Sequence, residues 1–67
     1  MSVKELRALT GMTQKQFAEY FGISKRTIES WEGGQRNIPH YLLDLMIYKL
    51  ENENIIERKN NNERKTY

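Results

Sequence analysis

Cysteine is absent from this 67-residue chain, and histidine and proline occur once each. Without cysteine the chain has no disulfide and no thiolate metal site. The single histidine, His40, has no carboxylate pair near it in the sequence, so no metal site is predicted. The sequence also lacks a glycine-rich phosphate loop after a strand pattern, and so short a chain has little room for a deep pocket. These absences argue against an enzyme, a cofactor and a bound metal.

Long apolar runs are lacking too. The longest is Leu45-Met46-Ile47-Tyr48, which is far too short to span a bilayer. No apolar segment typical of a signal peptide follows Met1, so we expect a cytoplasmic protein. The net charge of +2, from 11 Lys and Arg against 9 Asp and Glu, is small. It permits binding to nucleic acid without predicting it, and any basic surface has to come from the fold.

Helix boundary signals begin at the second residue. Ser2 followed by Glu5 is the signature of a capping box, in which each side chain binds the other residue's backbone N–H. Leu6 and Leu9 are three residues apart and are expected on one apolar face. Gly11 is suited to end the helix. The sequence therefore predicts a first helix over residues 3–10.

Two more helices follow closely. Thr13 and Gln16 repeat the capping-box signature, and Gly22 marks the end of the second helix. Ser24 is the expected N-cap of the third helix, which runs to about residue 32 and ends at the pair Gly33-Gly34.

The fourth helix begins with Pro39 in its first turn, where the missing N–H costs nothing. It continues to about Asn54 or a little beyond. The residues after it are polar and aperiodic, which is typical of disorder. The predicted fold is all-α, a compact lambda-repressor-like bundle of four helices, with a fifth left open. The domain is expected over residues 1–56, with a polar tail over residues 57–67.

The segment from Gln14 to Glu32 has the form of a helix-turn-helix, because two short capped helices are separated by about three residues. Ala18 is small and lets these helices approach closely, while Gly22 permits a sharp turn. Trp31 follows Ile28 by three residues, so we expect it in the core and not stacked on a base. The predicted core of the motif is Phe17, Ala18, Phe21, Gly22, Ile23, Ile28 and Trp31.

The third helix then presents an outward side with four candidate base contacts: Ser24, Lys25, Arg26 and Ser30. A helix fits the major groove of DNA, where Lys and Arg donate to guanine O6 and N7. The N-terminal residues of such a helix reach the base edges best. Glu29 either accepts from cytosine N4 or pairs with Lys25 one turn away, and the sequence leaves both open.

The spacing of these residues resembles the Cro/C1-type (XRE-like) helix-turn-helix family of phage and bacterial transcriptional repressors. The resemblance spans about Leu6 to Leu50 and is carried by Thr13-Gln14, Ala18, Gly22-Ile23-Ser24, Thr27-Ile28, Trp31-Glu32, Gly34 and Pro39. It implies sequence-specific binding to double-stranded DNA by a small, repressor-like regulator. It also implies contacts to DNA phosphates from Gln14, Gln35, Arg36 and Asn37. Many relatives dimerise through a fifth helix, whereas here a short polar tail follows the fourth.

The fourth helix carries more apolar residues than one face needs. One stripe should pack on the other helices: Leu43, Met46, Ile47 and Leu50. A second stripe, near heptad spacing, is the candidate dimer face: Tyr41, Leu45, Tyr48 and Ile55. A homodimer, an unidentified protein partner and simple exposure are all open at this point. The alternative function is accordingly a protein-interaction module, such as an antitoxin-like partner.

Overall fold

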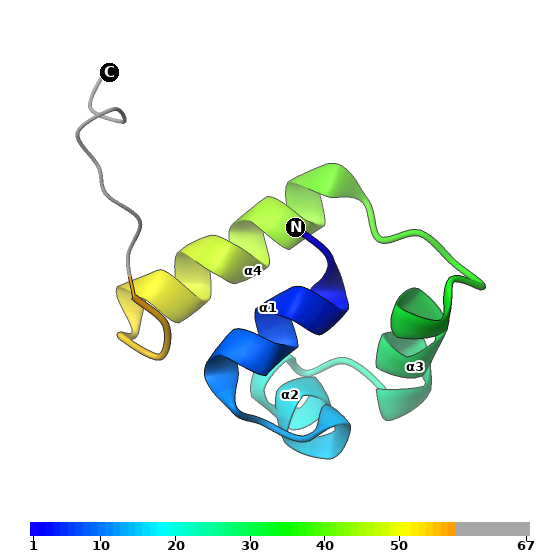
Figure 1. The fold of residues 1–67 in the computed structure, drawn as a ribbon, viewed down its shortest axis with the longest axis horizontal. Helices are drawn as coiled ribbons and strands as arrows, with labels where there is room; N and C mark the ends of the chain where they lie inside the picture. The colour runs from blue at the N-terminus through cyan, green and yellow to red at the C-terminus, as the bar shows by residue number, and fades with distance from the viewer. Residues whose placement is uncertain (58–67) are drawn as a thin grey trace.

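The computed structural model describes residues 1–57. The polar tail predicted for residues 57–67 therefore lies outside the described residues, apart from Glu57. Within residues 1–57 the chain forms four helices and no fifth: α1 (Val3–Thr10), α2 (Gln14–Phe21), α3 (Lys25–Gly33) and α4 (His40–Asn52) (Figure 1). The all-α helix-turn-helix fold predicted from the sequence is confirmed.

Side-chain caps fix where the first helices begin. In the box at α1, the Glu5 N–H donates to Ser2 Oγ at 3.0 Å and the Ser2 N–H donates to Glu5 Oε1 at 2.8 Å. Thr13 and Gln16 make the same reciprocal pair at α2, at 3.1 and 2.9 Å. These bonds satisfy backbone N–H groups that a helix start leaves without partners. Both capping boxes stand where the sequence predicts them.

A glycine ends each of the first three helices in a backbone conformation that other residues rarely adopt. Gly22 has φ of +69° after α2, and Gly34 has φ of +85° after α3. At such angles a Cβ clashes with the following carbonyl oxygen. Gly33 remains inside α3, so the helix ends one residue later than predicted.

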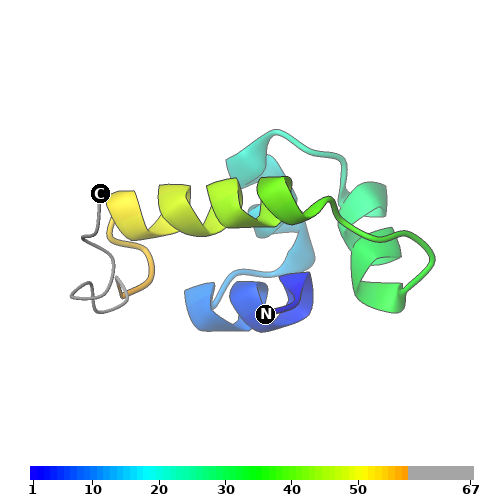
Figure 2. The ribbon, with the colours of Figure 1, turned by 90° about the horizontal axis from the view of Figure 1, so that it is seen from above.

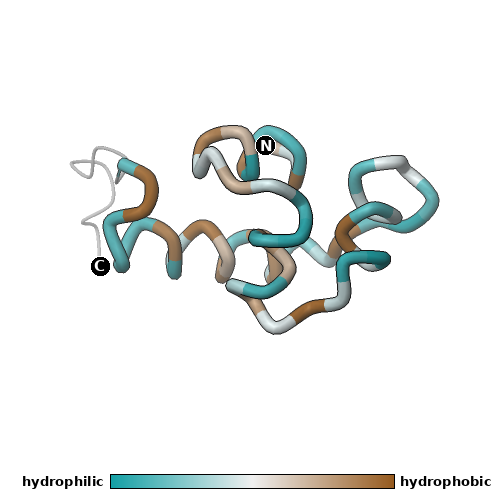
Figure 3. Tube along the Cα trace, turned by 90° about the horizontal axis from the view of Figure 1, so that it is seen from below, coloured by the Kyte–Doolittle hydropathy of each residue, from teal (hydrophilic) through white to brown (hydrophobic). Residues whose placement is uncertain are grey.

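The core lies where α4 crosses α1 and α2, with α3 at the end of the molecule where α4 begins (Figures 1 and 2). Hydrophobic and hydrophilic residues alternate along the helices, as expected when each buries one side (Figure 3). Eight buried residues form the core: Val3, Leu6, Phe17, Ala18, Ile28, Leu43, Met46 and Leu50. No helix within residues 1–57 is both long and apolar enough to cross a membrane.

Two details of the expected packing and caps are corrected. Leu9 is 58% exposed and does not share the buried face of Val3 and Leu6, because each step of three residues falls short of a full helical turn. Pro39 is the N-cap of α4 and not its first helical residue. Its carbonyl accepts the first hydrogen bonds of the helix, from the N–H groups of Leu42 and Leu43.

The end of α4 also differs from the expectation. The helix stops at Asn52, and Asn54 turns the chain with a φ of +61°. Ile55 then donates its N–H to the carbonyl of Leu50 at 2.9 Å and packs against the core. Ile55 therefore does not continue the outer stripe of α4, because it lies beyond the helix and faces inward.

Candidate nucleic-acid interface

The corner between α2 and α3 is built on buried side chains from both helices. Phe17, Ala18 and Ile28 are almost fully buried, while Phe21, Ile23 and Trp31 are partly buried and pack against them. The N–H of Ile23 bonds to the carbonyl of Ala18 at 2.9 Å, which closes the turn after α2. The structure thus brings six of the seven predicted core residues into one cluster, and the seventh, Gly22, makes the exposed turn.

The side of α3 opposite Ile28 faces solvent. Ile28 is fully buried, and successive residues of a helix are rotated by about 100°. Arg26 and Ser30 are one turn apart on the opposite side, where Arg26 is exposed and Ser30 is half-buried. This pair occupies the middle of the outward side.

Lys25 lies on the flank of that side and pairs with Glu29. Its Nζ is 3.4 Å from Glu29 Oε2, and both side chains are about half exposed, at 53% and 49%. An exposed pair one turn apart is worth less than about 1 kcal/mol. The free chain therefore holds Lys25 in place weakly, and a guanine edge or a phosphate can replace the carboxylate.

Ser24 is engaged in capping α3. Its Oγ accepts the N–H of Thr27 at 3.2 Å and lies 2.9 Å from Thr27 Oγ1. A hydroxyl has one donor and two acceptor sites. The cap therefore occupies two of the three sites and leaves one for a further contact.

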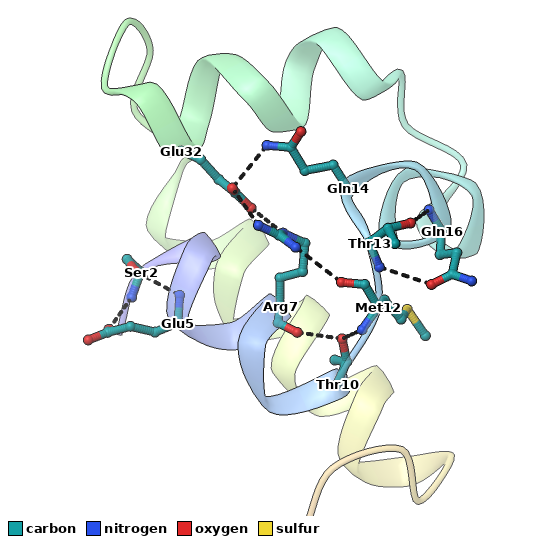
Figure 4. Close-up of polar contacts among 9 residues, drawn as sticks. All are labelled: Ser2, Glu5, Arg7, Thr10, Met12, Thr13, Gln14, Gln16 and Glu32. Carbon is teal, nitrogen blue, oxygen red and sulfur yellow. Dashed lines mark hydrogen bonds and ion pairs between the residues drawn. The ribbon is translucent and has the colours of Figure 1, made fainter.

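A polar network joins α1, α2 and α3 through the carboxylate of Glu32 (Figure 4). Arg7 Nε donates to Glu32 Oε2 at 2.6 Å, and another guanidinium nitrogen donates to Oε1 at 3.0 Å. Gln14 Nε2 donates to the same Oε1 at 3.1 Å. Arg7 also donates to the carbonyl of Met12 at 3.1 Å. One carboxylate thus connects α1, the first residue of α2 and the end of α3.

The charges within this network stabilise each other. The hydrogen bond from Arg7 holds the pKa of Glu32 below its ordinary value, and the Gln14 bond acts in the same direction. The Glu32 side chain is only 7% exposed and that of Arg7 is 21% exposed. Bidentate pairs of this kind are stronger and more rigid than exposed ion pairs. The network therefore fixes Gln14 beside the end of α3.

Sequence reasoning missed Arg7 and Glu32 as parts of this site. The two residues are 25 positions apart, on helices whose relative placement no local pattern gives. The only signal in the sequence was that Arg7 and Glu32 have opposite charges, and many other pairs of residues in the chain have opposite charges too.

The loop after α3 carries the remaining predicted phosphate contacts, Gln35, Arg36 and Asn37, and all three are exposed. Its backbone is tied to α3, because the N–H groups of Gln35 and Arg36 both donate to the Ser30 carbonyl, at 3.0 and 3.3 Å. These bonds hold the backbone of Arg36 just beyond the end of α3.

A second polar cluster lies away from this surface and ties α2 to the end of α4. Tyr20 donates its hydroxyl hydrogen to Glu53, which also pairs with Lys49 at 2.8 Å. The Lys49 Nζ lies 5.0 Å from the centre of the Tyr20 ring. Burial, together with the bond to Glu53, raises the pKa of Tyr20 to about 12. The hydrogen bond from Lys49, with that from Tyr20, lowers the pKa of Glu53.

The capped α2–turn–α3 corner with an exposed outer helix defines a helix-turn-helix protein. A family model described as Helix-turn-helix matches residues 3–40, more than half of the chain. The chain belongs to the Cro/C1-type helix-turn-helix family, which confirms the resemblance seen in the sequence. It is a DNA-binding regulator of a family whose domain is not enzymatic. Searches of the curated proteins and of the solved structures found no match to this chain.

Proposed function

We propose that this protein binds double-stranded DNA sequence-specifically, with α3 in the major groove, and regulates transcription as a small repressor. One observation carries the proposal. The outward side of α3 is polar, with Arg26 exposed and Ser30 half-buried, while the inner side is anchored by fully buried Ile28. A rigid helix with an open polar side matches the width of the major groove of B-DNA.

Base readout is assigned to the first turn and a half of α3. Arg26 donates two parallel hydrogen bonds to guanine O6 and N7, and Lys25 contacts a neighbouring base after leaving Glu29. Ser30 and Ser24 supply short hydroxyl contacts at either end of this row. Specificity should therefore depend most on Arg26.

Contacts to the DNA backbone are assigned to Gln14 at the start of α2 and to the loop that follows α3. One hydrogen of Gln14 Nε2 binds Glu32, and the second is directed to a phosphate oxygen. The backbone N–H groups at the start of α2 favour the same anion. Gln35, Arg36 and Asn37, in the loop that follows α3, bind further phosphates. These contacts position the protein without reading sequence.

The alternative role, a protein-interaction module of antitoxin type, has one observation in its favour. Tyr41, Leu45 and Tyr48 are exposed on α4. This surface is separate from the outward side of α3, so the two roles do not compete for the same residues. DNA binding is the better supported function because it uses the family match and the α3 surface together.

In vitro selection from a random duplex library, at near-physiological salt, tests the proposal. We expect an enriched motif that changes with Lys25→Ala and Arg26→Ala, because these side chains read bases. Gln14→Ala should lower affinity for all sequences alike. Loss of affinity without any change of motif in all three variants would contradict the base assignment. No enrichment by folded protein would contradict DNA recognition and favour the protein-partner role.

A further inference from the structure

The end of the Gln35 side chain lies in the space that a side chain on Gly33 would fill. Gly33 is the last residue of α3. A Cβ at this position would stand 2.7 Å from Gln35 Oε1 and 3.4 Å from Gln35 Cδ and Nε2. Its three nearest heavy atoms would thus all belong to the Gln35 amide, and the shortest distance is below van der Waals contact. The glycine therefore admits the amide, and any side chain at position 33 would displace it.

The space over Gly33 belongs to the outward side of α3. Gly33 follows buried Ile28 by five residues, which places it about 140° around the helix from Ile28. Arg26 lies in nearly the same direction, at about 160° from Ile28. Gly33 and Gln35 are both exposed. The Gln35 amide therefore extends the row that begins with Arg26 to the last turn of α3.

The backbone after α3 brings Gln35 back over the helix. The carbonyl of Ser30 accepts the N–H of Gly34. It also accepts the N–H groups of Gln35 and Arg36, at 3.0 and 3.3 Å. These bonds hold the start of the loop against the last turn of α3, within reach of Gly33 for a side chain as short as that of Gln35.

We propose that Gly33 is a positioning residue for DNA binding. The lack of a side chain at position 33 lets the Gln35 amide lie on the outward side of α3, where it donates to a phosphate oxygen. A phosphate is the partner because the amide lies at the C-terminal end of α3, whereas base edges are reached best from the N-terminal end. This inference rests on the proposed function and adds to it, because one phosphate contact then depends on a residue that has no side chain.

Titration of selected DNA with single and double variants of the full chain tests this dependence. Gln35→Ala removes the amide, and we expect binding about tenfold weaker, as for one lost hydrogen bond to a charged group. Gly33→Ala displaces the amide and should weaken binding by about three- to tenfold. The double variant should bind as Gln35→Ala alone does, because Gly33 acts only through Gln35.

Three further measurements separate positioning from a general loss of structure. The free energy of unfolding of Gly33→Ala should stay near that of the wild type. The slope of log affinity against log salt should not change in either single variant, because a neutral amide displaces no counterion. In the free wild-type chain, NMR should show a nuclear Overhauser effect between the Gln35 side-chain amide protons and the Gly33 α protons.

The double variant decides whether Gly33 acts through Gln35. An equal loss from Gly33→Ala with and without the Gln35 side chain would overturn the inference, since the added methyl group would then act by itself. Loss of affinity in Gln35→Ala alone, or the absence of the Overhauser effect, would overturn the positioning role. Unchanged affinity in both single variants would remove the amide from the interface.

The wild type separates these results from a failure of the proposed function. In every case above the wild-type chain still binds its selected DNA, so sequence-specific binding stands while this inference fails. A folded wild type that selects no DNA would contradict the proposed function, and this inference with it.

Discussion

Replacing Glu32 with glutamine should destabilise the whole domain. The substitution preserves the shape of the side chain but removes the charge that holds Arg7 and Gln14. Removing one member of a fully buried ion pair costs about 3–5 kcal/mol. The Arg7 side chain is 21% exposed, so water recovers part of that cost. We expect a loss of about 2 kcal/mol in the free energy of unfolding, close to the value of strong charged hydrogen bonds.

Thermal and urea unfolding followed by circular dichroism measure this loss. A domain of this size should lose about 10 °C in Tm for that change. Glu29→Gln is the matched control, because it removes the same charge from the exposed pair with Lys25 on the same helix. The control should change the free energy of unfolding by less than about 0.5 kcal/mol.

The pH dependence of the same variant provides a second measurement. The pKa of Glu32 is lowered in the folded chain. Ionised Glu32 therefore contributes to the free energy of unfolding at pH values above the pKa of an unfolded glutamate. That contribution is lost as the pH falls through the lower pKa of the folded chain. The difference between wild type and Glu32→Gln should therefore narrow below about pH 4.5. The reasoning would be refuted by equal stability of the Glu32 and Glu29 variants at neutral pH, or by a difference between wild type and Glu32→Gln that does not change in acid.

Three other expectations can be measured on the same protein. Gly34→Ala should lower the free energy of unfolding, measured in urea, by about 1–2 kcal/mol because Gly34 has a positive φ. Gly33→Ala should be near neutral, since the added Cβ meets only the movable Gln35 side chain. Equal losses in the two variants would contradict this reasoning. Tyr20 has a pKa raised to about 12 in the folded chain. The protonated hydroxyl therefore contributes fully to the free energy of unfolding below pH 10, and this contribution is lost as the pH rises towards 12. The difference in stability between the wild type and Tyr20→Phe should shrink over that pH range in alkaline denaturation. A constant difference would contradict the stabilising bond from the Tyr20 hydroxyl to Glu53. Arg36→Ala should reduce the slope of log affinity against log salt by about 1 in titrations with selected DNA, as expected for one lost phosphate contact; an unchanged slope would remove Arg36 from the interface.

The helix boundaries were predictable because they depend on neighbouring residues. The capping boxes at Ser2 and Thr13 and the glycine after each of the first three helices act within one turn, so their sequence spacing is sufficient. The end of α4 was placed too far along the chain because no cap residue marks it. There the return of Ile55 to the core decides the boundary, and that contact depends on tertiary packing.

The geometry of the candidate interface was predictable only in part, because some of its contacts depend on tertiary packing. Arg26 and Ser30 could be placed on the outward side of α3 because they lie opposite buried Ile28, and Lys25 could be placed on its flank. The link from Arg7 to Glu32 joins residues 25 positions apart, and it depends on how α1 packs against α3. Local patterns cannot give such a pairing, although it decides how Gln14 is held.

The helix α3 divides its tasks between its two sides. Ile28 and Glu32 hold it to the rest of the domain, while Arg26 is exposed on the other side. Under the proposed function, folding free energy and operator preference are therefore carried by different atoms of one helix. If Arg26 reads bases as proposed, its substitution redirects the protein to a new DNA sequence at little cost in stability, so that recognition in this domain is free to diverge while the scaffold is retained.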